Sequence, residues 1–286
     1  MAEIDHRLPW GTYQLQGWRQ ASLAVAHAVQ PHWPAAERVA KIFRHPVKHA
    51  GQPCYDVTIW GYRLRLTPHG NRSEARLLYA PQLFDAQERA FLARHTKPGG
   101  TFVDIGANAG AYTFWASRCM DAQGRILAFE PDPEMRARLA FNIASNGLHN
   151  VQVQPVALSD HAGSAVLHVN QRQRGQNTLE AARAAGGTDD RVAHTVEIDT
   201  LLNRLQQQDV RHVDALKIDI EGHEEPVLRH FFGHAPRSLW PRAILAEYTH
   251  DTHDAVQMLL ASAGYRIALE TDLNRGLLLD APGASA

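Results

Sequence analysis

The sequence predicts an α/β protein built on a mainly parallel, seven-stranded, doubly wound sheet. From residue 101 onward, short apolar runs of strand length alternate with helical stretches, which is typical of a sheet covered on both faces. The chain has 286 residues, of which 44% are hydrophobic and 21% charged, so it can form one large globular domain with an extension. We expect residues 81–286 to form that domain and residues 1–80 to form an N-terminal extension.

The extension is predicted to contain helices and a β-hairpin. We expect helices over residues 20–29 and 34–43, and the alternating apolar residues over 55–66 predict a hairpin. A helix over residues 81–95 should lead into the main domain. The extension is rich in tryptophan, which suits either a cap over an acceptor pocket or a homodimer contact. These tryptophans are Trp10, Trp18, Trp33 and Trp60.

Seven core strands follow. We place them at residues 101–105, 125–130, 151–156, 215–220, 243–248, 265–269 and 276–279. Asp132 before Pro133 predicts the start of one helix, and Asp199 is the expected N-cap of another over residues 200–208.

One interval departs from the alternation of strands and helices. Residues 165–169 and 192–198 are expected to form paired strands, and the polar stretch 170–191 between them is either a mobile lid or a solvated loop.

Charge and cysteine content exclude several classes of protein. Lysine and arginine (29) nearly balance aspartate and glutamate (30), so we expect neither nucleic acid nor a membrane as a partner. Cys54 and Cys119 have no neighbouring cysteine at metal-ligand spacing. The N-terminus lacks the pattern of a secretory signal, and no apolar stretch approaches the roughly 20 residues of a membrane span. A reduced, cytoplasmic setting is the expectation.

A glycine-bearing turn follows the first core strand. Asp104 ends the apolar run, and Gly106, Asn108 and Gly110 follow before a helix that begins near Ala111. Glycines let a ligand approach the main chain, and helix N–H groups can bind its polar end. A dinucleotide fingerprint would need glycines at positions 108 and 111, and a P-loop would need Gly-Lys-Ser/Thr. The turn therefore suits a nucleoside-like ligand without a pyrophosphate.

Glu130 ends the second core strand, one βα unit after Asp104. A carboxylate at this place can accept hydrogen bonds from both hydroxyls of a ribose. The alternative is that Glu130 caps the next helix or pairs with an arginine.

A cluster of ionisable residues follows the fourth core strand. Asp219, Glu221 and His223 alternate, so their side chains share a face while the chain stays extended. Such a cluster suits removal of a proton from a substrate hydroxyl group, or orientation of a cationic donor. We assign Glu224 and Glu225 instead to the start of the next helix.

These three segments together resemble the FkbM family of methyltransferases. The resemblance includes Glu130-Pro131 and the stretches 156–160 and 198–202, and it covers about residues 88–279. It implies a Rossmann-like class I methyltransferase fold, S-adenosylmethionine as cofactor, and O-methylation of a hydroxyl on a sugar or secondary-metabolite-type small molecule. It also implies roles by position: the turn for the methionine end, Glu130 for the ribose, Ser159 or Asp160 for the adenine, and Asp219 beside the sulfonium. The turn residues so implied are Asp104, Gly106, Asn108 and Gly110.

Methyl transfer from a sulfonium depends chiefly on positioning and needs no metal. A hydroxyl acceptor must lose its proton, and we place His223 slightly ahead of Asp219 and Glu221 as the base. Glu247 and His250, at the end of the fifth strand, either face the same crevice or are surface residues. The main mechanistic rival is a divalent metal bound by Asp219, Glu221, His223 and Glu247.

Two readings from other classes remain. A nicotinamide-dependent oxidoreductase would share the fold, but the missing glycines count against it. A non-catalytic nucleoside-binding module would also share it, but such a module has little use for an ionisable cluster at the ligand edge.

Overall fold

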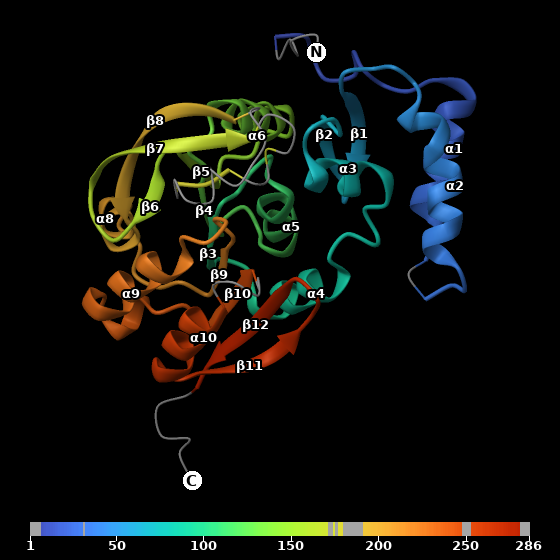
Figure 1. Ribbon diagram of the computed structural model, residues 1–286. Helices are drawn as coiled ribbons and strands as arrows, with labels where there is room; N and C mark the ends of the chain where they lie inside the picture. Colours follow the sequence, from blue (N-terminus) through green and yellow to red (C-terminus); the bar gives the residue numbers. More distant parts are fainter. Residues whose placement is uncertain are drawn as a thin grey trace.

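The computed structural model describes residues 7–30, 32–170, 174, 177–179, 191–247 and 253–280 (Figure 1). Its centre is a seven-stranded sheet in the order β11-β12-β10-β9-β3-β4-β5. The strands are β3 (Thr101–Ile105), β4 (Arg125–Phe129), β5 (Val151–Gln154), β9 (Ala215–Ile218), β10 (Ala243–Glu247), β11 (Tyr265–Glu270) and β12 (Asn274–Leu279). Only β12 runs antiparallel to its neighbours within this sheet. The predicted mainly parallel sheet is confirmed, with strand ends within two residues of the expected ones.

Helices cover both faces of this sheet, so successive residues of a strand enter different apolar clusters. Phe102 of β3 packs in the cluster that includes α4 (Ala86–His95), α5 (Ala111–Cys119) and α6 (Pro133–Ser145). Val103 packs in the opposite cluster, with α8 (Leu201–Gln207), α9 (Glu224–His234) and α10 (His253–Ser262). A short 3-10 helix, η2 (Arg237–Leu239), precedes β10. Burial on both faces explains why these strands read as continuous apolar runs.

The predicted helix starts are partly correct. The side chain of Asp132 accepts a hydrogen bond from the N–H of Glu134 at 2.9 Å, as expected of the N-cap of α6. The N-cap of α8 is Thr200 rather than Asp199, because Thr200 is still extended and its hydroxyl accepts from the N–H of Asn203.

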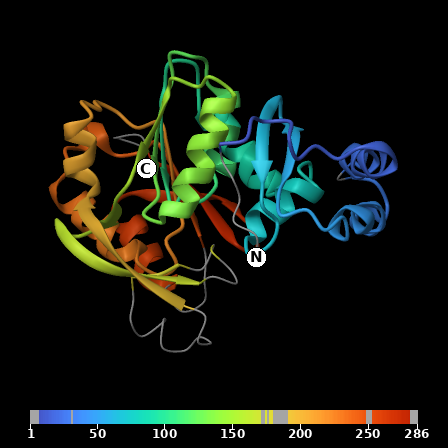
Figure 2. The ribbon, with the colours of Figure 1, turned by 90° about the horizontal axis from the view of Figure 1, so that it is seen from above.

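The N-terminal region contains the expected helices and hairpin. These are α1 (Gly17–Ala28), α2 (Ala36–Lys48), and the antiparallel strands β1 (Tyr55–Ile59) and β2 (Tyr62–Leu66). Figures 1 and 2 agree that α1 and α2 lie side by side at the outer edge of the molecule, away from the main sheet. A further helix, α3 (Arg72–Tyr79), was not predicted, and the helix expected over residues 81–95 begins only at residue 86.

The hairpin is fixed to the main domain through α6. Asn142 on α6 accepts a hydrogen bond from the N–H of Arg65 at 2.6 Å and donates one to its carbonyl at 3.2 Å. The buried side chain of Arg65 also pairs with Asp56 at 2.8 Å. The hairpin is therefore held against α6.

A second, three-stranded sheet has the order β6-β8-β7. Its strands are β6 (Ala157–Ser159), β7 (Gly163–Asn170) and β8 (Arg191–Thr200). The antiparallel pairing of β7 with β8 confirms the expected strand pair, while β6 was not predicted. Most of the polar stretch 170–191, for which a lid or a loop was expected, lies outside the described residues.

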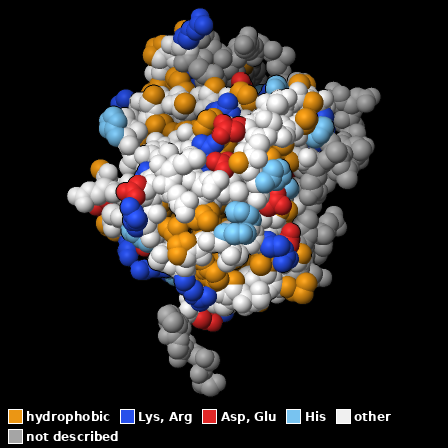
Figure 3. All heavy atoms as spheres, turned by 90° about the vertical axis from the view of Figure 1, so that its left-hand side faces the viewer, with side chains coloured by type: hydrophobic (Ala, Val, Ile, Leu, Met, Phe, Trp, Pro, Cys, Tyr) orange, Lys and Arg blue, Asp and Glu red, His pale blue; other side chains and the backbone are white. Residues whose placement is uncertain are grey.

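The surface shows no segregation of charge on the face in Figure 3, where basic and acidic side chains of the described residues are interspersed. No helix in the described part of the chain is long and apolar enough to cross a membrane.

Candidate functional site

One cavity lies at the carboxyl ends of β3, β4 and β9, where a doubly wound sheet binds its ligands. Its floor is the turn after β3, and its walls come from the segments that follow β4, β5 and β9. The N-terminal region closes another side, through Leu64 on β2 and Leu77 on α3. The predicted ligand edge of the sheet is therefore a built cavity, and the extension forms part of its wall.

The glycine-bearing turn is shaped by close contacts. Gly106 has φ +78°, and a Cβ there would lie 1.9 Å from the carbonyl oxygen of Asp219, so only glycine fits. Gly110 has φ +95°, and a Cβ there would lie 2.5 Å from a methyl group of Leu139. Asn108 also has positive φ, and its side-chain oxygen accepts from Asn71 at 2.6 Å. The turn is thus held from beneath by β9 and from the side by the N-terminal region.

Glu130 lies one residue beyond β4, in the cavity wall, and is 6% exposed. Its carboxylate accepts hydrogen bonds from the N–H of Asn108 at 2.7 Å and from the N–H of Asp132 at 2.8 Å. Burial raises the pKa of Glu130 to about 7, and the negative charge of Asp132 acts in the same direction. Since Asp132 is the helix cap, the capping role considered for Glu130 is wrong. The carboxylate keeps lone pairs that a ligand can use.

A row of charged side chains lies beneath the turn. Strand pairing places Asp104 of β3 opposite Lys217 of β9. Lys217 is 4% exposed, and its ammonium donates to the carbonyl of Gly106 and to Asp219, each at 3.2 Å. Burial acts to lower the pKa of Lys217, but Asp219 and Asp104 outweigh it, so the pKa is raised and the side chain is charged.

Asp104 does not have the direct contact expected of it. Its side chain is fully buried, accepts a hydrogen bond from the hydroxyl of Thr113 at 2.6 Å, and is absent from the cavity wall. Burial raises the pKa of Asp104. The expectation that Asp104 touches the donor is therefore corrected: the residue lies behind the turn and supports it.

The expected shared face of Asp219, Glu221 and His223 is wrong. Strand β9 ends at Ile218, and Glu221 has φ +54°, so the chain turns instead of staying extended. All three side chains still line the cavity.

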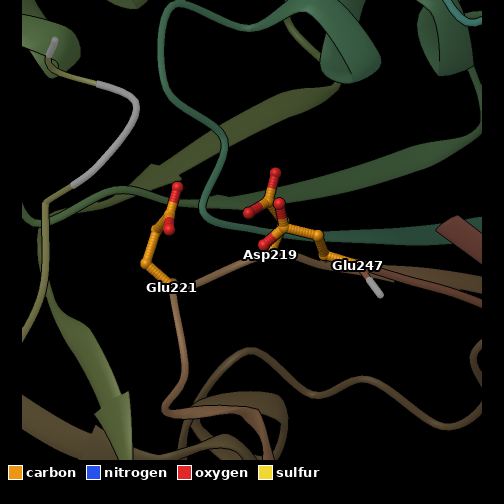
Figure 4. A group of neighbouring side chains, drawn as sticks. All are labelled: Asp219, Glu221 and Glu247. Carbon is orange, nitrogen blue, oxygen red and sulfur yellow. The ribbon is translucent and has the colours of Figure 1, made fainter. Parts of the chain in front are cut away.

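Two of these residues meet a third carboxylate. Asp219, Glu221 and Glu247 bring carboxylate oxygens within 4.8 Å of one another, and Figure 4 shows Asp219 and Glu247 adjacent with Glu221 facing them. Burial, together with Asp219 and Glu221, raises the pKa of Glu247 to about 9. His223 points elsewhere, with its Nε2 3.0 Å from the hydroxyl of Ser159. The turn at residue 221 therefore separates the imidazole from the carboxylates.

The three carboxylates offer oxygen atoms of the kind that divalent cations prefer. The expected fourth ligand, His223, is engaged with Ser159, and the ammonium of Lys217 already neutralises part of the cluster at Asp219. The candidate metal ligands in the described part of the chain are therefore the three carboxylates, without the imidazole of His223. His250, the other second-rank candidate, lies outside the described residues.

The residues expected at the adenine do not line the cavity. Ser159 is buried and bonded to His223, while Asp160 is exposed and accepts a hydrogen bond from His161 at 2.6 Å, which lowers its pKa. The cavity wall is made instead by the apolar residues 156–158 just before them. The part of this segment that lines the cavity therefore lies just before the predicted residues. Ser159 ends β6, and Asp160 is exposed to solvent.

Sequence reasoning missed the contribution of α3 and of Arg174. Arg174 lines the cavity and pairs with Asp132 at 3.0 Å. On α3, Glu74 lines the cavity and pairs with Arg138 of α6 at 2.5 Å. The spacing of Asn71, which caps α3, and Glu74 is a start pattern for helices and could have revealed this one.

Comparison with known proteins adds to this geometry. The family model described as "Methyltransferase FkbM domain" matches residues 104–267. Methyltransferase sdnD of Sordaria araneosa is 33% identical over 152 residues, which are 44% of this chain and 58% of that protein. Methyltransferase 1 of Beauveria bassiana is 28% identical over 143 residues, covering 44% of this chain and 56% of that protein. The chain thus spans little more than half the length of these two relatives.

Solved methyltransferase structures are similar at lower identity. The O-methyltransferase from Bacillus cereus, solved in complex with SAH, is 14% identical with a TM-score of 0.42, covering 68% of this chain and 81% of that one. The precorrin-6y C5,15-methyltransferase from Geobacter metallireducens is also 14% identical, with a TM-score of 0.40, covering 68% and 88%.

Proposed function

This chain belongs to the FkbM methyltransferase family and has the Rossmann-like class I methyltransferase fold, and from that premise we propose that it is an S-adenosylmethionine-dependent O-methyltransferase. Its acceptor is proposed to be a hydroxyl of a sugar or a secondary-metabolite-type small molecule. The observation that carries the proposal is Glu130, a buried carboxylate that opens into the cavity and is bonded to the main chain of the glycine turn at Asn108.

The cavity offers three consecutive regions for the donor. The turn around Gly106 and Asn108 would take the methionine end, Glu130 the ribose hydroxyls, and the apolar residues 156–158 the adenine. When bound, S-adenosylmethionine supplies a methyl group activated by a positive sulfur. The carboxylates Asp219 and Glu221 suit a ligand with that charge, since opposite charges at short range attract strongly in a partly buried site.

The acceptor hydroxyl must lose its proton as the new bond forms. We infer that the carboxylates of Asp219 and Glu221 take it, because both line the cavity beyond the end of β9. Glu247 lies beside them, but its pKa of about 9 leaves it protonated near neutral pH. His223 is the alternative base, and its Nε2 lies 3.0 Å from the hydroxyl of Ser159. A comparison of Glu221→Gln with His223→Ala separates the two, since a general base contributes about 10²- to 10⁴-fold to the rate.

The first test is binding by calorimetry of S-adenosylmethionine, S-adenosylhomocysteine and NAD. We expect micromolar binding of both sulfur nucleosides, a loss in Glu130→Ala, no change in the exposed control Glu37→Ala, and no effect of EDTA. Preference for NAD would favour the oxidoreductase reading, and failure of the sulfur nucleosides to bind would refute the proposal.

The second test concerns the acceptor. The protein is incubated with S-adenosylmethionine and a panel of sugars and hydroxylated natural products, and products are searched for a mass gain of one methylene. Recovery of methyl groups only on nitrogen or carbon would overturn the assignment of O-methylation while leaving the donor assignment intact.

A further inference from the structure

Positive charge is concentrated in the N-terminal region. Residues 7–50 contain six lysine or arginine residues and one acidic residue, Glu37, although the whole chain has a net charge of −1. The balance over the whole chain, from which no membrane partner is expected, therefore hides a local excess of positive charge. The six basic residues are Arg7, Arg19, Arg38, Lys41, Arg44 and Lys48.

Helix α2 presents part of this charge along one exposed stripe. Arg38, Lys41, His45 and Lys48 recur at intervals of three and four residues, so they lie on one side of the helix, and all four are exposed. Neither Arg38 nor the two lysines have an ion-pair partner in the described part of the chain. The stripe is therefore available to negative charge from outside the molecule.

Exposed apolar side chains accompany the charged stripe. Ile42 lies one turn after Arg38 and keeps 67% of its surface exposed. Trp18, at the start of α1, is 65% exposed, and Trp33, just before α2, is 49% exposed. Half of the large hydrophobic residues that are exposed in the described ranges lie within residues 7–50. The outer helices thus combine cations with apolar groups that no other part of the fold covers.

The inner side of this helix pair is fixed to the rest of the protein. The Nε2 of His27 on α1 lies 2.7 Å from the carbonyl oxygen of Leu78 on α3. Tyr55 of β1 donates its hydroxyl to the carbonyl of Val47 on α2 at 2.8 Å. Figures 1 and 2 show both helices at the outer edge of the molecule. The stripe therefore lies on a helix with a defined place in the fold.

We propose that the exposed face of α2 docks on an anionic lipid membrane. Arg38, Lys41 and Lys48 meet the lipid phosphates, and Ile42 enters the boundary between headgroups and acyl chains. The exposed tryptophans beside this face have amphipathic rings of the kind that suits a membrane interface. This docking surface goes beyond the proposed function and does not depend on it.

The combination of charge and apolar surface favours a bilayer over other partners. A second copy in a symmetric dimer would bring the cationic stripe against itself, and like charges repel. The backbone of a nucleic acid would satisfy the cations but offers no apolar layer for Ile42. An anionic bilayer supplies phosphates at its surface and hydrocarbon directly beneath them.

Vesicle flotation tests the proposal with lipids of defined composition. The protein is mixed with unilamellar vesicles of phosphatidylcholine alone, or of phosphatidylcholine with about 30% phosphatidylserine. The wild type should float with the anionic vesicles only. Salt at about 0.5 M should release it, because salt screens the attraction between exposed charges.

Variants of α2 assign the binding to the stripe. The triple variant Arg38→Gln, Lys41→Gln, Lys48→Gln should bind the anionic vesicles on the order of 100-fold more weakly, since each cation near such a surface contributes about fivefold. Ile42→Ser should weaken binding about tenfold, because an apolar side chain no longer leaves water.

A matched control removes the same charge elsewhere. The triple variant Lys97→Gln, Arg229→Gln, Arg266→Gln changes three exposed basic residues outside the N-terminal region and should bind the vesicles as the wild type does. Thermal melting checks that both triple variants are folded. Binding of S-adenosylhomocysteine should be the same in the wild type and in both triple variants.

The outcomes decide between partners and keep the two proposals separate. Membrane docking is overturned if the wild type does not float, if it floats equally with both kinds of vesicle, or if both triple variants lose binding equally. Unchanged binding by Ile42→Ser, or binding of a nucleic acid duplex through the same residues without vesicle binding, would also overturn the assignment to a bilayer. Failure of S-adenosylhomocysteine to bind would refute the proposed function and leave membrane docking intact.

Discussion

Replacing Glu130 by Gln should remove a pH-dependent loss of stability. The pKa of Glu130 rises from 4.5 to about 7 on folding, chiefly through burial. Below pH 4.5 the group is protonated in both states, and between these values only the folded state holds the proton. The stability from this group is therefore full below pH 4.5 and is lost as the pH rises through 7. The rise corresponds to about 3 kcal/mol.

Urea denaturation of the wild type and of Glu130→Gln at pH 5, 6, 7 and 8 measures this effect. The difference in the free energy of unfolding between variant and wild type should grow by about 2.5 kcal/mol in favour of the variant between pH 5 and 8. A constant offset is expected as well, because a glutamine offers only one oxygen to the N–H groups of Asn108 and Asp132. Parallel pH profiles for Glu130→Gln, wild type and the exposed control Glu37→Gln would refute the reasoning.

The same residue should control the pH dependence of ligand binding. Ribose hydroxyls donate to a carboxylate, so the ionised form of Glu130 should bind S-adenosylhomocysteine better than the protonated form. Affinity in the wild type is expected to rise from pH 6 to 8, approaching a factor of about 10 per pH unit well below pH 7. In Glu130→Gln the profile should be flat, and a slope that survives the substitution would show that another group titrates.

Three further predictions follow from buried positions. Gly106→Ala should abolish binding of S-adenosylhomocysteine and lower the melting temperature, since its Cβ would lie 1.9 Å from a main-chain oxygen; unchanged binding would contradict the geometry of the turn. Asp56→Ala leaves the buried charge of Arg65 without its carboxylate and should reduce the free energy of unfolding by about 3–5 kcal/mol, whereas a loss under 1 kcal/mol would mean that the arginine reaches water. Burial raises the pKa of Cys54 to about 12, so in a Cys119→Ser background the native protein should react with a disulfide reagent only as fast as it unfolds.

The core of the fold could be predicted because its pattern is local. Strand β3 is an apolar run buried along its whole length, and its bounds agree with the prediction. Helix α3 was missed because it is eight residues long and begins with charged and polar residues. Its apolar residues, Leu77 and Leu78, find their partners in the hairpin and in α5, which are distant in the sequence.

The candidate site divides in the same way. Gly106, Glu130 and Asp219 follow β3, β4 and β9, which are neighbouring parallel strands, so topology alone brings them to one edge. His223 was wrongly expected to share a face with Asp219, because the chain turns at Gly222. A glycine just before a helix is a turn signal that could have indicated this. The contribution of Leu77 to the cavity depends on tertiary packing that no periodicity encodes.

Lys217 lies on β9 between two carboxylates. Strand pairing places Lys217 opposite Asp104 of β3, and Asp219 lies one residue beyond the end of β9. Taking a charged side chain out of water costs several kcal/mol, and well-packed apolar residues often stabilise such positions equally or better. At position 217 the charge of the lysine is offset by Asp219 and Asp104, which raise its pKa in spite of burial.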